Sequence, residues 1–316
     1  MPLAIALLPA PGPADDSRQP AAGGPDSATA DSDVLAEQAA TRDAALGQAA
    51  DDFFRTAAEL LDQSPPPDTT ALPGLTLRHS VTAGTSPTLE LPIHAGRASL
   101  GWVTQSIRNE RQLPAPNAVR LEEILNRFTL QPTGSAAICQ GVSITTEALP
   151  CPWKPSATLL LISIRGAADA ARDFTASFHA DPTTVAFYRL LGYAPLTGLS
   201  PGPLPSRLPA KSITTLALEI EPSSTATAFG ALEWTLDGQP AATIPITHHL
   251  DAEPSNDARF ASVVCAFAQW LAHDQPAFID TELLAALARE IASATLPPDR
   301  ADLLTLIGQA LQLEDR

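Results

Sequence analysis

The spacing of apolar residues along this chain changes its period twice. Between residues 98 and 128, apolar side chains recur every three or four positions, which is typical of helices that bury one face. From 142 to 247 they mostly alternate with polar residues, the pattern of strands with one buried face. Beyond residue 256 the helical period returns. The pattern therefore predicts helices, then strands, then helices.

The period and the residues that break it give bounds for each predicted element. Helices are expected at 98–109, 117–128, 257–273, 282–293 and 300–313. Strands are expected at 88–93, 142–148, 159–164, 174–178, 212–220, 228–236 and 241–247, whereas 185–191 fits either a strand or a helical turn. The predicted fold class is α+β: an antiparallel, β-sandwich-like sheet core with flanking N-terminal helices and a C-terminal helical segment.

Short polar motifs refine this prediction at particular residues. Asn117 is a good N-cap for the second helix, and Ser255 or Asn256 can cap the third. Asp237-Gly238 predicts a tight hairpin turn, and Pro245 predicts that the strand after it lies at a sheet edge. Glu122 and Glu123 are expected to be solvated acids in the first turn of a helix, where the helix dipole favours them.

The first seventy residues differ from the rest in composition. They carry twelve acidic and three basic side chains, so nine of the sixteen excess negative charges of the chain lie there. Residues 11–33 are rich in Ala, Asp, Gly, Pro and Ser, a composition that predicts disorder, and 34–63 fits one helix. We therefore divide the chain into an acidic segment, 1–70, and two parts, 71–166 and 167–316, that are expected to pack as one unit.

The net charge of −16 bears on the kind of partner. It argues against a nucleic-acid surface, which must offer Lys and Arg to phosphates, and against docking on anionic lipid. No apolar stretch approaches the roughly 18–20 residues of a transmembrane span. Residues 2–10 are apolar but lack a basic leader. We expect a periplasmic or cell-envelope protein if a signal sequence lies upstream of the given start, and a cytoplasmic one otherwise.

The three cysteines show no metal-ligand spacing. Cys139 and Cys151 can bridge a hairpin if the compartment is oxidising, although two separate buried thiols are the favoured interpretation. Cys265 lies in an apolar helical run. We also identify no nucleophile elbow (Gly-x-Ser-x-Gly), no His-Glu-x-x-His and no Gly-rich phosphate loop. We therefore assign no catalytic, metal or cofactor-binding residue and expect a protein that is not an enzyme.

Two separated stretches resemble one bacterial family. The N-terminal stretch, about 89–166, includes Val119-Arg120-Leu121-Glu122-Glu123 and the run 147–153; the C-terminal stretch, about 174–313, includes 185–193, 215–220 and Arg259-Phe260-Ala261. They resemble the regions before and after the metal-binding domain of von Willebrand factor A (VWA) proteins of the YfbK type, the second being a domain of unknown function.

In that family a whole metal-binding VWA domain separates the two stretches, and here only residues 167–173 do. The resemblance implies a divalent-ion site built on Asp-x-Ser-x-Ser, which occurs nowhere in this chain. We therefore expect that the VWA domain and its metal-dependent adhesion are missing. The loop from Gly166 to Phe174 is expected to close two neighbouring strands.

Four residues are candidates for binding a protein partner: Trp153, Tyr188, Arg189 and Tyr193. Trp153 lies between prolines and suits either a surface contact or a rigid corner packed on the sheet. The other three can line a groove, although the favoured interpretation of Arg189 is a structural pairing with an acid such as Glu147 or Glu219.

Our hypothesis from the sequence is a non-enzymatic protein-interaction or scaffold protein with a protein partner and no cofactor. Two alternatives stay open. One is an enzyme with an unrecognised site, around His248-His249 or His179, and the other is a structural component of the cell envelope.

Overall fold

The computed structural model describes residues 77–93, 96–194, 207–223, 227–247, 253–274, 278–292 and 296–314. The chain divides into two compact units, Met1–Pro66 and Pro67–Arg316, and every described residue lies in the second. The predicted disorder of 11–33 and the predicted helix over 34–63 lie outside the described residues, as do His248 and His249.

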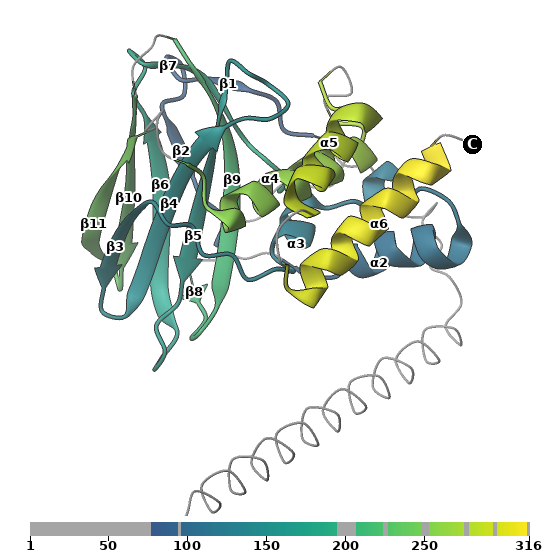
Figure 1. Ribbon diagram of the computed structural model, residues 1–316. Helices are drawn as coiled ribbons and strands as arrows, with labels where there is room; N and C mark the ends of the chain where they lie inside the picture. Colours follow the sequence, from purple (N-terminus) through teal and green to yellow (C-terminus); the bar gives the residue numbers. More distant parts are fainter. Residues whose placement is uncertain are drawn as a thin grey trace, which may run out of the picture. The chain divides into compact units, whose positions relative to one another are not determined.

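Two antiparallel sheets form the centre of this unit (Figure 1). The six-stranded sheet has the order β1-β7-β9-β5-β4-β3, and the second sheet has the order β11-β10-β6-β2, with β8 also pairing with β6. The strands are β1 Val81–Thr82, β2 Thr88–Glu90, β3 Ser135–Cys139, β4 Val142–Pro150, β5 Thr158–Arg165, β6 Arg172–Ala180, β7 Val185–Leu190, β8 Arg207–Leu208, β9 Ile213–Pro222, β10 Ala228–Leu236 and β11 Gln239–Thr247.

Helices gather on one side of this pair of sheets (Figure 1). They are α2 Ser99–Gln105, which continues as the π-helical turn η2 Ser106–Glu110, the 3₁₀ turn η3 Pro116–Ala118, α3 Leu121–Leu125, α4 Asn256–Leu271, α5 Thr281–Ala292 and α6 Pro298–Glu314. Among the described residues, no helix combines the length and apolar character needed to cross a bilayer. The predicted α+β class, with antiparallel sheets and C-terminal helices, is confirmed.

Strand β5 explains how the layers are held together. Leu159 and Leu161 pack into the core that the six-stranded sheet shares with the helices, whereas Leu160 and Ile162 pack into the core between the two sheets. A strand buried on both faces reads as a continuous apolar run, which is how β5 appears in the sequence. The six-stranded sheet is therefore the middle layer of the unit.

Local turn chemistry places several strands as the sequence predicts. Asp237 and Gly238 have φ angles of 50° and 75°, the left-handed pair that a tight hairpin between twisted strands requires. Strand β11 lies at a sheet edge, so Pro245 interrupts no ladder on its outer side. The 185–191 segment, which fitted a strand or a helical turn, contains strand β7.

The helix predicted over 117–128 is shorter than expected. Asn117 lies in the 3₁₀ turn η3, and α3 begins only at Leu121, with Arg120 at its N-cap position. The Ser99 hydroxyl accepts a hydrogen bond from the Arg120 N–H at 2.9 Å and donates one to the Ala118 carbonyl at 3.0 Å. These contacts engage the backbone on both sides of Val119, which is extended, so the helix starts after it.

The junction at Gly166–Phe174 corrects one expectation. Strand β5 already has β4 and β9 as neighbours, so it offers no free edge to β6, and the junction instead links the two sheets. Segment 207–212 contacts both ends of the junction: the Gly166 N–H donates to the Ser212 carbonyl at 2.9 Å, and β8 pairs with the start of β6.

A bridge between Cys139 and Cys151 is also excluded by the fold. Cys139 pairs with Val142 at one end of β4, and Cys151 directly follows the other end. Because β4 is nine residues long, its ends lie roughly 25–30 Å apart at about 3.3 Å per residue. A disulfide needs Cα atoms within roughly 7 Å. The alternative of separate thiols is correct, and Cys265 is buried in the helix α4.

The thiols should therefore differ in reactivity. Burial raises the pKa of the Cys151 thiol to about 12 and raises that of Cys265 further, so neither forms a thiolate at neutral pH. We expect a disulfide-exchange reagent to modify Cys139, which is only partly buried, in the native protein, and all three cysteines after denaturation. Cys139→Ser should abolish the native reaction; rapid native labelling of that variant would contradict the buried positions.

Candidate functional site

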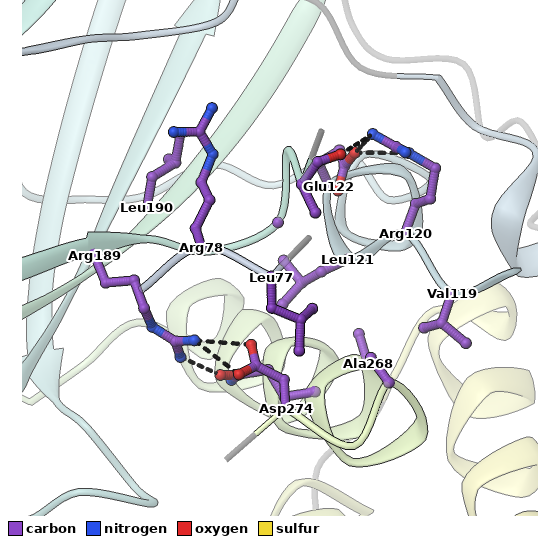
Figure 2. Close-up of a pocket in the computed structure, with 14 residues that line it drawn as sticks. Leu77, Arg78, Val119, Arg120, Leu121, Glu122, Arg189, Leu190, Ala268 and Asp274 are labelled. Carbon is purple, nitrogen blue, oxygen red and sulfur yellow. Dashed lines mark hydrogen bonds and ion pairs between the residues drawn. The ribbon is translucent and has the colours of Figure 1, made fainter. Parts of the chain in front are cut away.

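A cluster of buried charged and polar side chains lies where β7 and β9 meet helix α4. The Arg189 side chain on β7 is only 4% exposed. Its Nη1 donates to both carboxylate oxygens of Asp274, at 3.0 and 2.8 Å, and its Nη2 donates to Gln269 Oε1 at 2.6 Å. Figure 2 shows the Arg189–Asp274 pair at one side of a small pocket. Arg189 thus joins the sheet to the end of α4.

Glu219 stands directly opposite Arg189 in the β7–β9 pairing and is 1% exposed. Its Oε2 accepts a hydrogen bond from Trp153 Nε1 at 2.9 Å and lies 3.5 Å from Arg189 Nη2. Its Oε1 lies 3.5 Å from Lys154 Nζ. A carboxylate removed from water is costly unless it is paired and hydrogen-bonded, and Glu219 is both. The burial of the Glu219 carboxylate therefore depends on the positive charges of Arg189 and Lys154.

Lys154 completes this cluster at the surface. Its Nζ lies 2.5 Å from Glu221 Oε1, and it sits over the Phe278 ring, 5.8 Å from the centroid. Partial burial disfavours the charged ammonium, but the hydrogen bond to Glu221 and the charge of Glu219 outweigh it, so the pKa of Lys154 lies above its usual value. Lys154 therefore stays charged at neutral pH.

A second buried acid lies on the other side of the pocket (Figure 2). Glu122, 4% exposed, accepts hydrogen bonds from Arg120 Nε at 2.9 Å and from the Tyr193 N–H at 2.8 Å. Gly192 has a φ of +76°, and a Cβ there would lie 2.9 Å from the Glu122 backbone nitrogen. The chain after β7 therefore passes so close to α3 that only glycine fits.

The expectation that Glu122 and Glu123 are solvated is wrong. Glu122 is buried against Arg120, and Glu123 Oε2 accepts the Ala98 and Ser99 N–H groups, each at 3.0 Å, at the start of α2. Both acids hold neighbouring segments together. The sequence gives little signal for this, because apart from Arg120 the groups they bind are backbone amides more than twenty residues away.

The pocket between the two clusters is small. It is lined by residues of 77–78, 119–122, 189–194 and the end of α4, and its volume is about 30 Å³. Such a volume holds one or two water molecules, whereas sites for small-molecule ligands usually measure about 300–1,000 Å³. The arrangement is therefore suited to holding layers together, not to receiving a substrate.

The four predicted partner-binding residues do not form one surface. Trp153 and Tyr188 are each 2% exposed, so the surface interpretation of both is corrected. Trp153 is the rigid corner packed on the sheet, and Tyr188 donates from its hydroxyl to the Ser86 carbonyl at 2.6 Å inside the other core. Arg189 pairs with Glu219, as the structural alternative proposed.

Tyr193 and Glu147 also have structural positions in the fold. Tyr193 is partly buried with a φ of 53°, and burial raises the pKa of its hydroxyl. Glu147 does not reach Arg189. Its carboxylate accepts the Ser255 N–H at 2.7 Å and the Ser255 hydroxyl at 2.8 Å, which holds the N-cap of α4 on strand β4.

The described histidines offer no cluster. His179 on β6 contacts Thr88 Oγ1 at 3.2 Å through Nδ1 and Glu233 at 3.5 Å through Nε2 on the outer face of the second sheet. Within the part of the chain that the structure describes, no three His, Cys, Asp or Glu side chains are grouped to hold a metal ion.

One motif in the sequence was missed. Gly198-Leu199-Ser200-Pro201-Gly202 matches Gly-x-Ser-x-Gly, the spacing of a nucleophile elbow. That motif is meaningful only on a strand-to-helix turn, and the segment lies outside the described residues. Scanning the Pro- and Gly-rich stretch for the spacing itself would have found it.

Comparison with known proteins gives one result. A family model described as von Willebrand factor matches residues 78–161, about a quarter of the chain. Residues 78–161 are therefore a von Willebrand A-like region, and such regions suggest a general role in protein interaction or scaffolding. No curated protein and no solved structure matches the chain.

The position of the match bears on the sequence analysis. The VWA domain was expected to be missing and 71–166 to resemble the region before it, but the von Willebrand match falls within 71–166 and is therefore at odds with that expected absence. In the structure this stretch supplies β3, β4, β5 and the short helices α2 and α3.

Arg189 should matter more to stability than any exposed arginine. Arg189→Ala leaves Glu219 and Asp274 without their shared partner, and breaking such a buried pair costs about 3–5 kcal/mol. The matched control is Arg207→Ala, because Arg207 is 72% exposed and its ion pair with Asp173 should be worth less than about 1 kcal/mol. Urea unfolding would measure both; equal losses would contradict the role of Arg189.

Proposed function

We propose that this chain is a non-enzymatic protein-interaction platform, related to the YfbK-type VWA proteins but lacking their metal-binding domain. The proposal rests on one observation: segment 207–212 is hydrogen-bonded to both ends of the Gly166–Phe174 junction. Lys211 N–H donates to the Ala167 carbonyl at 2.9 Å, while Arg207 and Leu208 pair with Asp173 and Arg172. Both ends of the junction are thus fixed by one short segment.

An inserted domain requires two chain ends that are held near each other, and segment 207–212 holds the two ends of the junction in this way. Domains are inserted or lost without harm where the two chain ends lie close together at the surface. Residues 168–170 between those ends are exposed, and the strands on either side belong to a fold that does not depend on them. The absence of a domain at this place therefore leaves the two sheets intact.

The acids of the matched stretch support a structural role. Residues 78–161 contain no aspartate and five glutamates. Glu122, Glu123 and Glu147 bind backbone amides or arginine as described above, and Glu110 accepts from Ser106 and Gln112. Carboxylates engaged in this way are not available as a hard-cation site. The von Willebrand match is therefore interpreted as the platform and not as the metal-binding domain.

An interaction assay tests the function directly. Immobilised full-length protein should retain a protein from extracts of the source cells, and the purified pair should rebind with a dissociation constant of about micromolar order. Binding should change less than about twofold between EDTA and millimolar Mg²⁺, because no metal-dependent contact is involved.

A serine-directed phosphonate probe provides the opposing test. The Gly198–Gly202 motif favours a hydrolase as the second candidate, with Ser200 as its nucleophile. No labelling is expected. Stoichiometric labelling that Ser200→Ala abolishes, together with ester hydrolysis and no retained partner, would replace the platform with an enzyme.

Restoring a domain tests the relationship to the VWA proteins. A folded VWA domain inserted between Ala168 and Asp169 should leave the host melting temperature within about 4 °C, since closing the longer connection costs about 1 kcal/mol. The control places the same domain between Asp237 and Gly238. It should destabilise the host more, because the Asp237 carboxylate accepts from Arg172 Nη1 and the Asp173 N–H. Equal losses at both places would argue against a former insertion point.

A further inference from the structure

A groove with an apolar floor lies among the helices of the described unit. It has a volume of about 350 Å³ and lies between residues 113–114, the end of α4, the start of α5 and the end of α6. This volume is at the lower end of the range of ligand sites, and it exceeds that of the pocket beside Arg189 about tenfold. None of the four candidate partner-binding residues lines it.

The floor of the groove is apolar and held in place. Leu113, Trp270, Leu271 and Ile279 line it, and Leu271 and Ile279 are buried in the helical core. The Trp270 ring stacks on Phe267, with 6.3 Å between centroids and an interplanar angle of 21°. A stacked, partly buried tryptophan offers a fixed aromatic surface that costs little entropy to use.

The rim of the groove is acidic. Asp280 and Glu314 line it, and neither forms an ion pair with any of the described residues. Asp280 Oδ1 accepts the Leu283 N–H at 2.8 Å, so its carboxylate is held at the start of α5. His273, with a φ of 53°, is the remaining ionisable side chain in the lining.

These features fit a cation carried on an apolar stem. Lys and Arg side chains lay their methylene groups on apolar surface and keep the charged head near acids or over an aromatic face. The protein already uses this contact internally, since the Arg300 guanidinium lies 4.8 Å from the Phe260 ring centroid. Residues 71–316 also carry more acids than bases, with a net charge of −7 (−16 less the −9 of residues 1–70), which favours basic partners over acidic ones.

We infer that this groove binds a Lys or Arg side chain presented by a basic segment of a partner protein. The inference rests on the proposed interaction function and names its recognition chemistry. Trp270 and Leu113 receive the stem, and Asp280 and Glu314 receive the charge.

Small amides test the groove without knowledge of the partner. In the full-length protein, N-acetyl-arginine amide and N-acetyl-lysine amide are titrated while the indole N–H signals of the four tryptophans are followed by NMR. The Trp270 signal, assigned through Trp270→Phe, should shift saturably with a dissociation constant of about millimolar order. N-acetyl-norleucine amide, which has the stem without the charge, should bind at least about fivefold more weakly.

Variants of the rim test the charge. Asp280→Asn with Glu314→Gln should weaken binding of both amides about fivefold, and the asparagine still caps α5. As a control, Glu233→Gln removes one carboxylate charge from the outer face of the second sheet and should leave binding of both amides unchanged. Equal binding of the norleucine amide, unaltered binding by the double variant, or shifts at Trp102 alone would overturn the inference. A partner retained in the capture assay despite such a result would leave the platform standing and this groove excluded.

Discussion

Arg189 and Glu219 face each other across β7 and β9, on the side of the six-stranded sheet that the helices cover. A single contact at 3.5 Å does not offset the free energy lost when two opposite charges are removed from water at such a position. Further hydrogen bonds and ion pairs around the two side chains offset the remaining cost. Asp274 and Gln269 bind Arg189 from the end of α4, and Trp153 and Lys154 bind Glu219 from the corner after β4.

This cluster explains why the helices pack on the sheet in one way. Purely apolar surfaces allow sliding with little penalty, whereas buried charges require particular partners at particular distances. The Ser255 cap on Glu147 fixes the beginning of α4, and the Arg189 contacts fix its end. The sixteen residues of α4 between them are mostly buried, and small residues such as Ala261 and Ala266 are part of the core that the helices share with the sheet. The polar contacts set the position, and the apolar contacts supply most of the free energy.

Local patterns predicted the elements well because each depends on neighbouring residues. The Asp237-Gly238 turn, the Ser255 cap and the uninterrupted apolar run of β5 are determined within a few positions of the chain. What failed depends on distant partners. Trp153 is buried because Glu219, 66 residues away, accepts its indole N–H, and Glu122 is buried because Tyr193 and Arg120 meet it. The division of β5 and β6 between two sheets is likewise invisible in a pattern that both arrangements satisfy.

Charged side chains that are buried in this fold are poor candidates for binding a partner. Arg189, Glu219 and Glu122 are charged side chains of the kind found in functional sites, but their hydrogen bonds and ion pairs are made within the protein. A side chain whose partners are internal cannot exchange them for a ligand without exposing a buried charge. The proposed recognition therefore relies on acids that have no counter-charge among the described residues. Asp280 and Glu314 lie beside Trp270 in the groove among the helices, where the stacking on Phe267 fixes the Trp270 ring and the α5 cap fixes Asp280.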